Sequence, residues 1–125
     1  MPTMSKQTAK YNDEGPGVEW VQDLADQRVS IVEVKEDADL TPLLQGLPND
    51  QCQCPHSGYV FKGEIWWRYG DRLEVVKAGE AYHAPPGHTS GAKAGSEFLV
   101  ISPANQMDKL EAHMAKRAQE LGATP

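Results

Sequence analysis

The segment from Cys52 to His88 constrains the fold more than any other part of the chain. It places Cys52, Cys54 and His56 before a predicted β-hairpin and His88 after it. Thiolate sulfur and imidazole nitrogen are the ligands that zinc prefers. Because the strands of a small closed barrel can aim distant side chains at one interior point, the pattern predicts a β-barrel with a site inside it.

Turn residues and β-branched residues support an all-β fold. Predicted strands 57–69 and 72–77 flank Gly70-Asp71, and glycine at the first central position of a two-residue loop favours a type II′ hairpin turn. Short strands at this spacing indicate a closed or sandwiched sheet. The other predicted strands are 28–35, a short one ending at His83, and 97–102.

The two ends of the chain differ from this pattern. Residues 1–17 are polar and close with a Gly-Pro-Gly turn, which predicts a flexible arm before a barrel domain at 18–102. In the C-terminal segment 103–122 the apolar residues recur at helical spacing, so we expect one amphipathic helix packed on the barrel. Ser102 is the expected N-cap of that helix.

Size and charge exclude several classes of function. A chain of 125 residues suits one domain, and a net charge of −6 argues against a nucleic-acid partner. The sequence has no apolar run that suggests a membrane span and no secretory h-region, so a cytoplasmic, reducing location is expected. In that compartment cysteines are thiols or metal ligands more often than disulfides.

Residues 46–102 resemble the cupin superfamily. Its first motif has glycine, a His-x-His pair, a glutamate and a second glycine; aligned on 59–63, it puts His56 at the glutamate, Cys52 at the second histidine and Asp50 at the first. Its second motif matches at Gly79 and Pro85-Pro86-Gly87.

The second motif departs from the superfamily at its ligand. The histidine that should follow the glycine turn falls on Ser90, whereas His88 lies two residues earlier. The resemblance implies a double-stranded β-helix, or jelly-roll barrel, with a C-terminal helix. It also implies a divalent metal, zinc first because of the thiolate, with iron, nickel or manganese as alternatives.

This resemblance implies two kinds of function. One is a metal-dependent enzyme of dioxygenase, isomerase or lyase type that acts on or binds a small oxygen-rich organic molecule. The alternative is a non-catalytic module that binds a small ligand or senses a metal. Fold alone does not choose between them.

The expected metal ligands are Cys52, His56 and His88, with Cys54 and His83 as weaker alternatives. On an extended strand Cys52 and His56 lie about 13 Å apart, beyond their combined reach, whereas Cys54 and His56 lie about 6.6 Å apart. A bend at Pro55 would change this geometry, so both pairings stay open. The competing interpretation of each residue is a buried or hydrogen-bonded side chain with no ligand.

Aromatic residues provide the expected ligand pocket and an expected interface. Tyr59, Trp67 and Phe98 are the predicted pocket residues, although aromatic residues in a β core are more often structural. Trp66 and Trp67 put indole rings on both faces of one strand. The outer face is therefore expected to be covered by the N-terminal segment or by a second copy in a homodimer.

Overall fold

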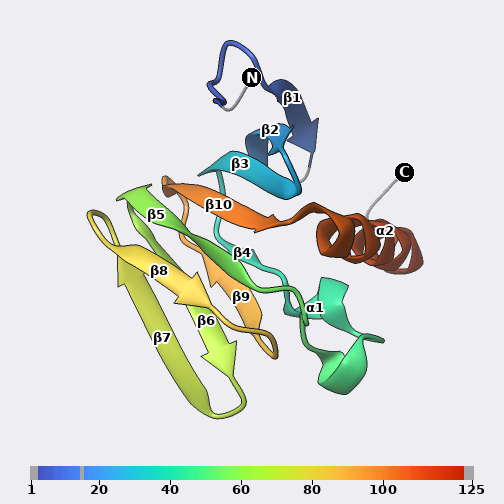
Figure 1. Ribbon diagram of the computed structural model, residues 1–125. Coiled ribbons are helices and arrows are strands. Elements are labelled where there is room, and N and C mark those ends of the chain that lie inside the picture. Colours follow the sequence, from blue (N-terminus) through green and yellow to red (C-terminus); the bar gives the residue numbers. More distant parts are fainter. Residues whose placement is uncertain (1–2, 15, 123–125) are drawn as a thin grey trace.

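The structure is a computed structural model that describes residues 3–14 and 16–122 and contains two antiparallel β-sheets with a long C-terminal helix (Figure 1). The first sheet contains, in spatial order, β1 (Lys10–Glu14), β2 (Gly17–Leu24), β3 (Gln27–Val34), β10 (Glu97–Pro103), β5 (His56–Lys62) and β8 (Ala81–Ala84). The second contains β4 (Ala38–Asp39), β9 (Thr89–Ala92), β6 (Glu64–Tyr69) and β7 (Arg72–Lys77). The predicted all-β fold with one C-terminal helix is confirmed.

The predicted hairpin forms between β6 and β7. Tyr69 pairs with Arg72, and Gly70 has a φ of +61°, as the first central residue of a type II′ turn requires. The predicted strand 57–69 is interrupted at Gly63, whose φ is +73°, and the chain passes there from one sheet to the other. A Cβ at Gly63 would lie against Ser96, so glycine is required at this crossing.

The N-terminal segment differs from the expected flexible arm, because β1 pairs with β2 at the edge of the first sheet. A polar sequence forms a strand here since the backbone hydrogen bonds do not depend on apolar side chains. Tyr11 packs against Trp20 with ring centroids 5.3 Å apart. The strand therefore shields part of β2.

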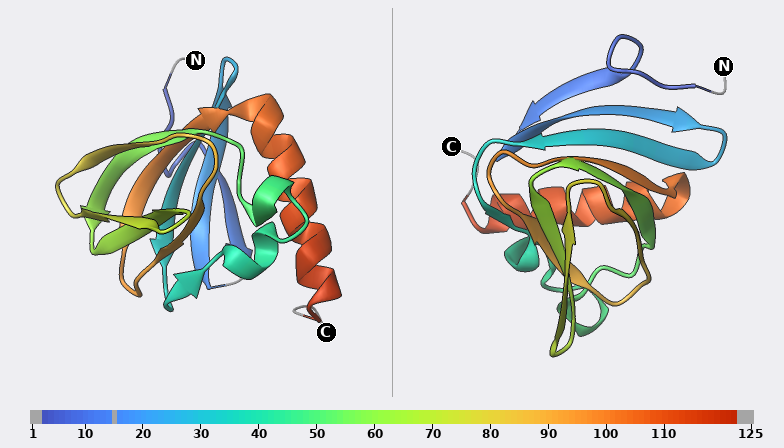
Figure 2. Two further views of the ribbon diagram at one scale, coloured as in Figure 1. Left: turned by 90° about the horizontal axis from the view of Figure 1, so that it is seen from below. Right: turned by 90° about the vertical axis from the view of Figure 1, so that its left-hand side faces the viewer.

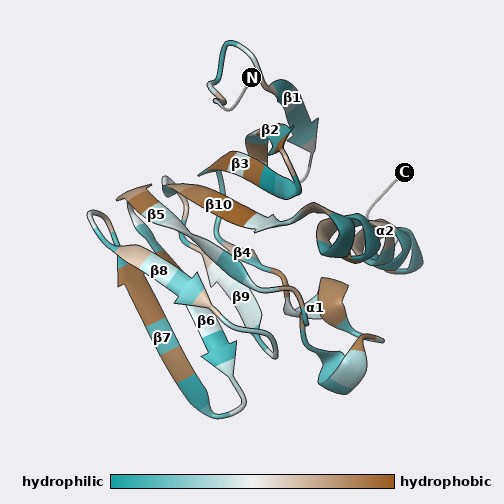
Figure 3. Ribbon diagram, in the orientation of Figure 1, coloured by the Kyte–Doolittle hydropathy of each residue, from teal (hydrophilic) through white to brown (hydrophobic). Residues whose placement is uncertain are grey.

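Two clusters of buried apolar residues make up the core. The first lies between the sheets, and the second lies between α2 (Ala104–Glu120) and the loop that contains α1 (Thr41–Leu44) and the 3₁₀ turn Pro48–Asp50. Hydrophobic residues colour parts of β3, β10 and α1 brown in Figure 3. The first cluster comprises Val34, Val60, Ile65, Trp67, Ala84 and Ala92, and the second comprises Leu44, Cys52, Cys54 and Leu110.

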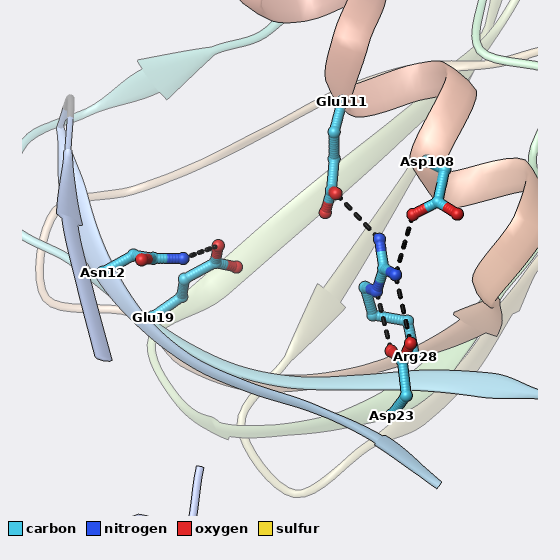
Figure 4. A network of polar contacts seen from close by, with 6 residues as sticks. All are labelled: Asn12, Glu19, Asp23, Arg28, Asp108 and Glu111. Atoms are coloured by element: carbon cyan, nitrogen blue, oxygen red, sulfur yellow. Dashed lines mark hydrogen bonds and ion pairs between the residues drawn. The ribbon is translucent and has the colours of Figure 1, made fainter. Parts of the chain in front are cut away.

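Arg28 fastens α2 to the first sheet (Figure 4). Its guanidinium lies 2.8 Å from each of Asp23, Asp108 and Glu111, and its side chain is only 13% exposed. These ion pairs connect α2 to the first sheet, and the two views of Figure 2 show the helix running alongside the sheets. No helix among the described residues is long and apolar enough to cross a membrane.

Candidate metal centre and its cavity

Cys52, His56 and His88 meet inside the barrel. Their ligand atoms all lie within 4.8 Å of one another. The three residues are 3%, 7% and 0% exposed, respectively, so bulk water does not surround them. This is the one group of three His, Cys, Asp or Glu residues among the described parts of the chain that could hold a metal ion.

Backbone hydrogen bonds bring Cys52 and His88 together. The Cys52 amide donates to the His88 carbonyl at 2.8 Å, and the Gly87 amide donates to the Cys52 carbonyl at 2.8 Å. Gly87 has a φ of +91°, a conformation that other residues rarely adopt. The predicted Pro-Pro-Gly turn therefore brings His88, rather than Ser90, to Cys52 and His56.

His88 presents a free ring nitrogen to the group. Its Nδ1 donates to the Pro85 carbonyl oxygen, 2.7 Å away, which fixes Nε2 as the nitrogen with a lone pair. Nε2 is buried and has no hydrogen-bond partner among the described residues. Burial lowers the pKa of His88, so the ring is held neutral, as a metal ligand must be.

His56 is oriented in a similar way from β5. Its Nδ1 lies 2.6 Å from Ser102 Oγ on β10, and its Nε2 lies 3.6 Å from Cys52 Sγ. Burial and the nearby His88 lower the pKa of His56 to about 3. A tetrahedral zinc, with bonds of about 2.3 Å to sulfur and about 2.0–2.1 Å to nitrogen, sets these two atoms about 3.5 Å apart. The observed spacing fits such an ion.

The thiol of Cys52 is not activated by its surroundings. Burial raises its pKa, and its sulfur donates to the Cys54 carbonyl oxygen at 3.6 Å. A neutral thiol beside a neutral imidazole is not the thiolate–imidazolium pair that nucleophilic catalysis uses. The arrangement is suited instead to a cation that displaces the thiol proton on binding.

The other expected ligands lie outside this group. Cys54 is buried, and its sulfur donates to the Pro55 carbonyl oxygen at 3.6 Å. His83 Nδ1 lies 2.8 Å from Ser57 Oγ on an exposed side, and Asp50 accepts a hydrogen bond from the Gly46 amide. Residues 51–55 are not a regular strand, so the extended spacing that favoured Cys54 over Cys52 does not apply.

A cavity of about 370 Å³ adjoins the group on the side of His56. Of the expected pocket residues, Trp67 and Phe98 line it, and the Trp67 ring lies 4.9 Å from the His88 ring. Tyr59 differs from the expectation, because its side chain is 38% exposed and packs against Phe61 instead. Ser90 contributes to the lining but is not one of the three grouped residues.

Two contributions to this site were not predicted. Ser102 was expected to cap α2, but α2 has no side-chain cap, and the hydroxyl of Ser102 contacts His56. Met107, Leu110 and Met114 were expected only to pack, yet they line the cavity. An apolar stripe on a helix gives no signal that distinguishes the two roles.

No protein-family model and no curated protein matches the chain. Solved structures do match. An RmlC-like cupin from Shewanella frigidimarina is 14% identical over 81% of this chain and 89% of its own, with a TM-score of 0.57. The fold is a cupin fold.

Two structures named for enzymes share this cupin fold. The polyketide cyclase RemF from Streptomyces resistomycificus is 20% identical over 83% of this chain and 80% of its own, with a TM-score of 0.57. Oxalate decarboxylase from Bacillus subtilis is 14% identical over 80% of this chain but 28% of its own, with a TM-score of 0.58. At these identities the likeness is one of fold.

Proposed function

We propose that this cupin-fold protein binds a divalent metal ion through Cys52 Sγ, His56 Nε2 and His88 Nε2, and that a small organic molecule binds beside the ion. A sulfur and two nitrogen ligands favour zinc among the common divalent ions, with iron, nickel and manganese as rivals. Three protein ligands leave a fourth tetrahedral position for water or the small molecule.

The unpartnered Nε2 of His88 carries this proposal. A buried polar atom without a partner costs free energy, about 1–3 kcal/mol, and demands an explanation. Here the residue belongs to a group whose ligand atoms all lie within 4.8 Å of one another, and the Pro85 carbonyl orients its ring. Metal-binding histidines commonly have their other ring nitrogen fixed by such a partner.

The position of His56 sets where a small molecule would approach. His56 lines the cavity, whereas Cys52 and His88 do not, so the approach to the ion runs along the His56 ring beside Trp67. A bound ion would supply Lewis-acid polarisation of an oxygen on that molecule or activation of water. The protein's own residues would hold the molecule in place and exclude bulk water from it.

Metal analysis of wild type, Cys52→Ser and Cys54→Ser tests the proposal. Protein purified without chelator or a nickel-charged column should contain close to one equivalent of ion in wild type and in Cys54→Ser, and much less in Cys52→Ser. Cys54 is the matched control because it is also buried and lies two residues away. Equal metal content in the two variants, or none in wild type, would contradict the proposed site.

A non-catalytic binding module is the second candidate. His56 and Glu19 are the only ionisable residues among the described residues that line the cavity. If His56 holds the ion, the described residues of the cavity wall offer no second imidazole for acid–base catalysis. A small molecule that is recovered unchanged after incubation with metal-loaded protein would favour this module, and its conversion would favour an enzyme.

A further inference from the structure

We infer that the cavity takes a compact, largely apolar molecule with a single polar group at the end nearest His56. The placing of that polar group rests on the proposed function, because it would face the ion. The apolar character of the rest of the molecule rests on the cavity wall alone.

One wall is an apolar strip on the inner face of the first sheet. Val32 on β3 pairs with Phe98 on β10, and Val100 lies two residues further along β10. All three line the cavity. Since residues two apart on a strand share a face, the strip is continuous across the two strands.

Another part of the wall comes from α2. Met107, Leu110 and Met114 recur at intervals of three and four residues, so they form one stripe along the helix, and all three line the cavity. An apolar sheet face and an apolar helix face therefore both contribute to the wall of the cavity.

The protein's own side chains do not close this space. Residues of both buried clusters line the cavity, for example Ile65 of the first and Leu110 of the second, so the cavity adjoins both clusters. Val32, Phe98 and Met114 stay only half-buried although they face the interior. A ligand that covers them would gain the free energy of apolar burial, as in most small-molecule sites.

Apolar residues outnumber the polar ones in the wall, whose polar side chains are those of Asn12, Glu19, Ser30, His56 and Ser90. No Lys or Arg is present among the described residues that line the cavity, and the one acidic side chain, Glu19, already accepts a hydrogen bond from Asn12 at 3.2 Å. Beyond the proposed ion, a dicarboxylate would meet no cationic side chain among the described residues of the wall. A sugar would lose hydrogen bonds to water that the valines and methionines cannot replace.

Chain-length dependence of alcohol binding tests the inference. Dissociation constants of 1-butanol, 1-hexanol and 1-octanol are measured by calorimetry on zinc-loaded and on EDTA-treated protein. Each added methylene should tighten binding about fourfold until the cavity is filled. Hexane-1,2,6-triol has the same carbon skeleton length as 1-hexanol and should bind more than tenfold more weakly than it. Dissociation constants that do not change with chain length, or a triol that binds as tightly as 1-hexanol, would overturn the inference.

Comparison of the zinc-loaded protein with the EDTA-treated protein separates the inference from the proposed function. The same dependence on chain length in EDTA-treated protein, with no zinc bound by wild type, would support the apolar cavity and refute the ion. Stoichiometric zinc, together with dissociation constants that do not change with chain length, would support the ion and refute the apolar cavity.

Variants of α2 place the alcohols in the cavity. Met114→Trp, or Met107→Trp as a second choice, should fill part of the space and weaken hexanol binding at least tenfold with zinc content unchanged. Lys109→Trp is the matched control because Lys109 is exposed on the same helix. Equal hexanol affinity in all three variants would place the binding elsewhere and contradict the inference.

Discussion

Ser102 Oγ on β10 lies 2.6 Å from His56 Nδ1 on the neighbouring strand β5. The two residues are both buried, and this contact fixes the orientation of the imidazole ring. When His56 Nε2 carries the lone pair, Nδ1 carries the hydrogen and donates it to the serine oxygen. Ser102 is therefore a positioning residue for one of the three proposed metal ligands.

Ser102→Ala should weaken zinc binding by about 10–100-fold, because loss of a partner behind a metal-bound histidine has effects of that size. Competition with a chromophoric zinc chelator measures the change. Ser57→Ala is the control, since Ser57 makes the same kind of contact with His83, at 2.8 Å, outside the grouped residues. An equal effect of both substitutions would remove the special role of Ser102.

His56→Ala and His88→Ala should each lower zinc content strongly, and the double variant should add little because a metal site acts as a unit. Zinc should raise the thermal midpoint of wild type but not of either variant, since a ligand stabilises only the state that binds it. Elemental analysis and thermal melts with and without zinc check both points. Full zinc content in His56→Ala would contradict the site.

The stability of metal-free protein should depend on pH through the same two histidines. Burial is the main cause that lowers the pKa of His56 and His88 below the ordinary value of 6.5. Below about pH 6.5 the unfolded chain takes up protons that the folded protein does not, so the free energy of unfolding falls as the pH falls. Above that pH this contribution to the free energy of unfolding is retained in full.

Below about pH 6.5 the free energy of unfolding should fall by up to about 1.4 kcal/mol per pH unit for each histidine. Urea titrations of EDTA-treated protein at pH 7, 6 and 5 measure it, and His56→Gln should show a shallower slope than wild type. A wild-type stability that is constant or rises over this range would contradict the assignment of neutral buried rings.

Arg28→Ala should lower the free energy of unfolding by about 1–3 kcal/mol, because the Arg28 side chain, only 13% exposed, makes charged hydrogen bonds to Asp23, Asp108 and Glu111. Lys35→Ala removes an ion pair between two exposed side chains, Lys35 and Asp13, and should cost at most about 1 kcal/mol. Urea unfolding measures both. Equal losses would mean that Arg28 does not fasten α2.

The protein should form a homodimer through the outer face of β6 and β7. Trp66 pairs there with Val75, and Leu73 and Val75 on that face are 49% and 42% exposed. Light scattering should give twice the chain mass at micromolar concentration. Val75→Glu should shift the measured mass toward that of the monomer. Lys77→Glu, at the end of the strand, should leave the measured mass unchanged. A wild-type monomer would refute the interface.

Local chemistry was sufficient to predict most of the fold. The Gly70 turn, the strand that became β3 and the helical spacing after Pro103 each depend on neighbouring residues, and each was predicted from them. The strand β1 was missed because its polar sequence carries no apolar alternation. The signal that makes it a strand is the backbone edge of β2, which the sequence does not display.

The structure brings together three residues that the sequence named as candidate ligands, but the local geometry that joins them was not predicted. Cys52, His56 and His88 were named, yet the choice between Cys52 and Cys54 depended on assuming an extended strand where the chain instead turns. The role of Ser102 depends on its pairing across β10 and β5, which is a tertiary relationship. A serine before a helical segment has the same sequence signature whether it caps that helix or contacts a histidine.

The backbone pairing of Cys52 with His88 bears on the order of events when the chain folds. The two residues are far apart in the sequence, so we expect the loop between them to close only after the hairpin and the turn at Gly87 have formed. Contacts of such long range arise late, because their closure entropy must be offset first. An ion would then meet a barrel already assembled and would slow its unfolding more than it speeds its folding.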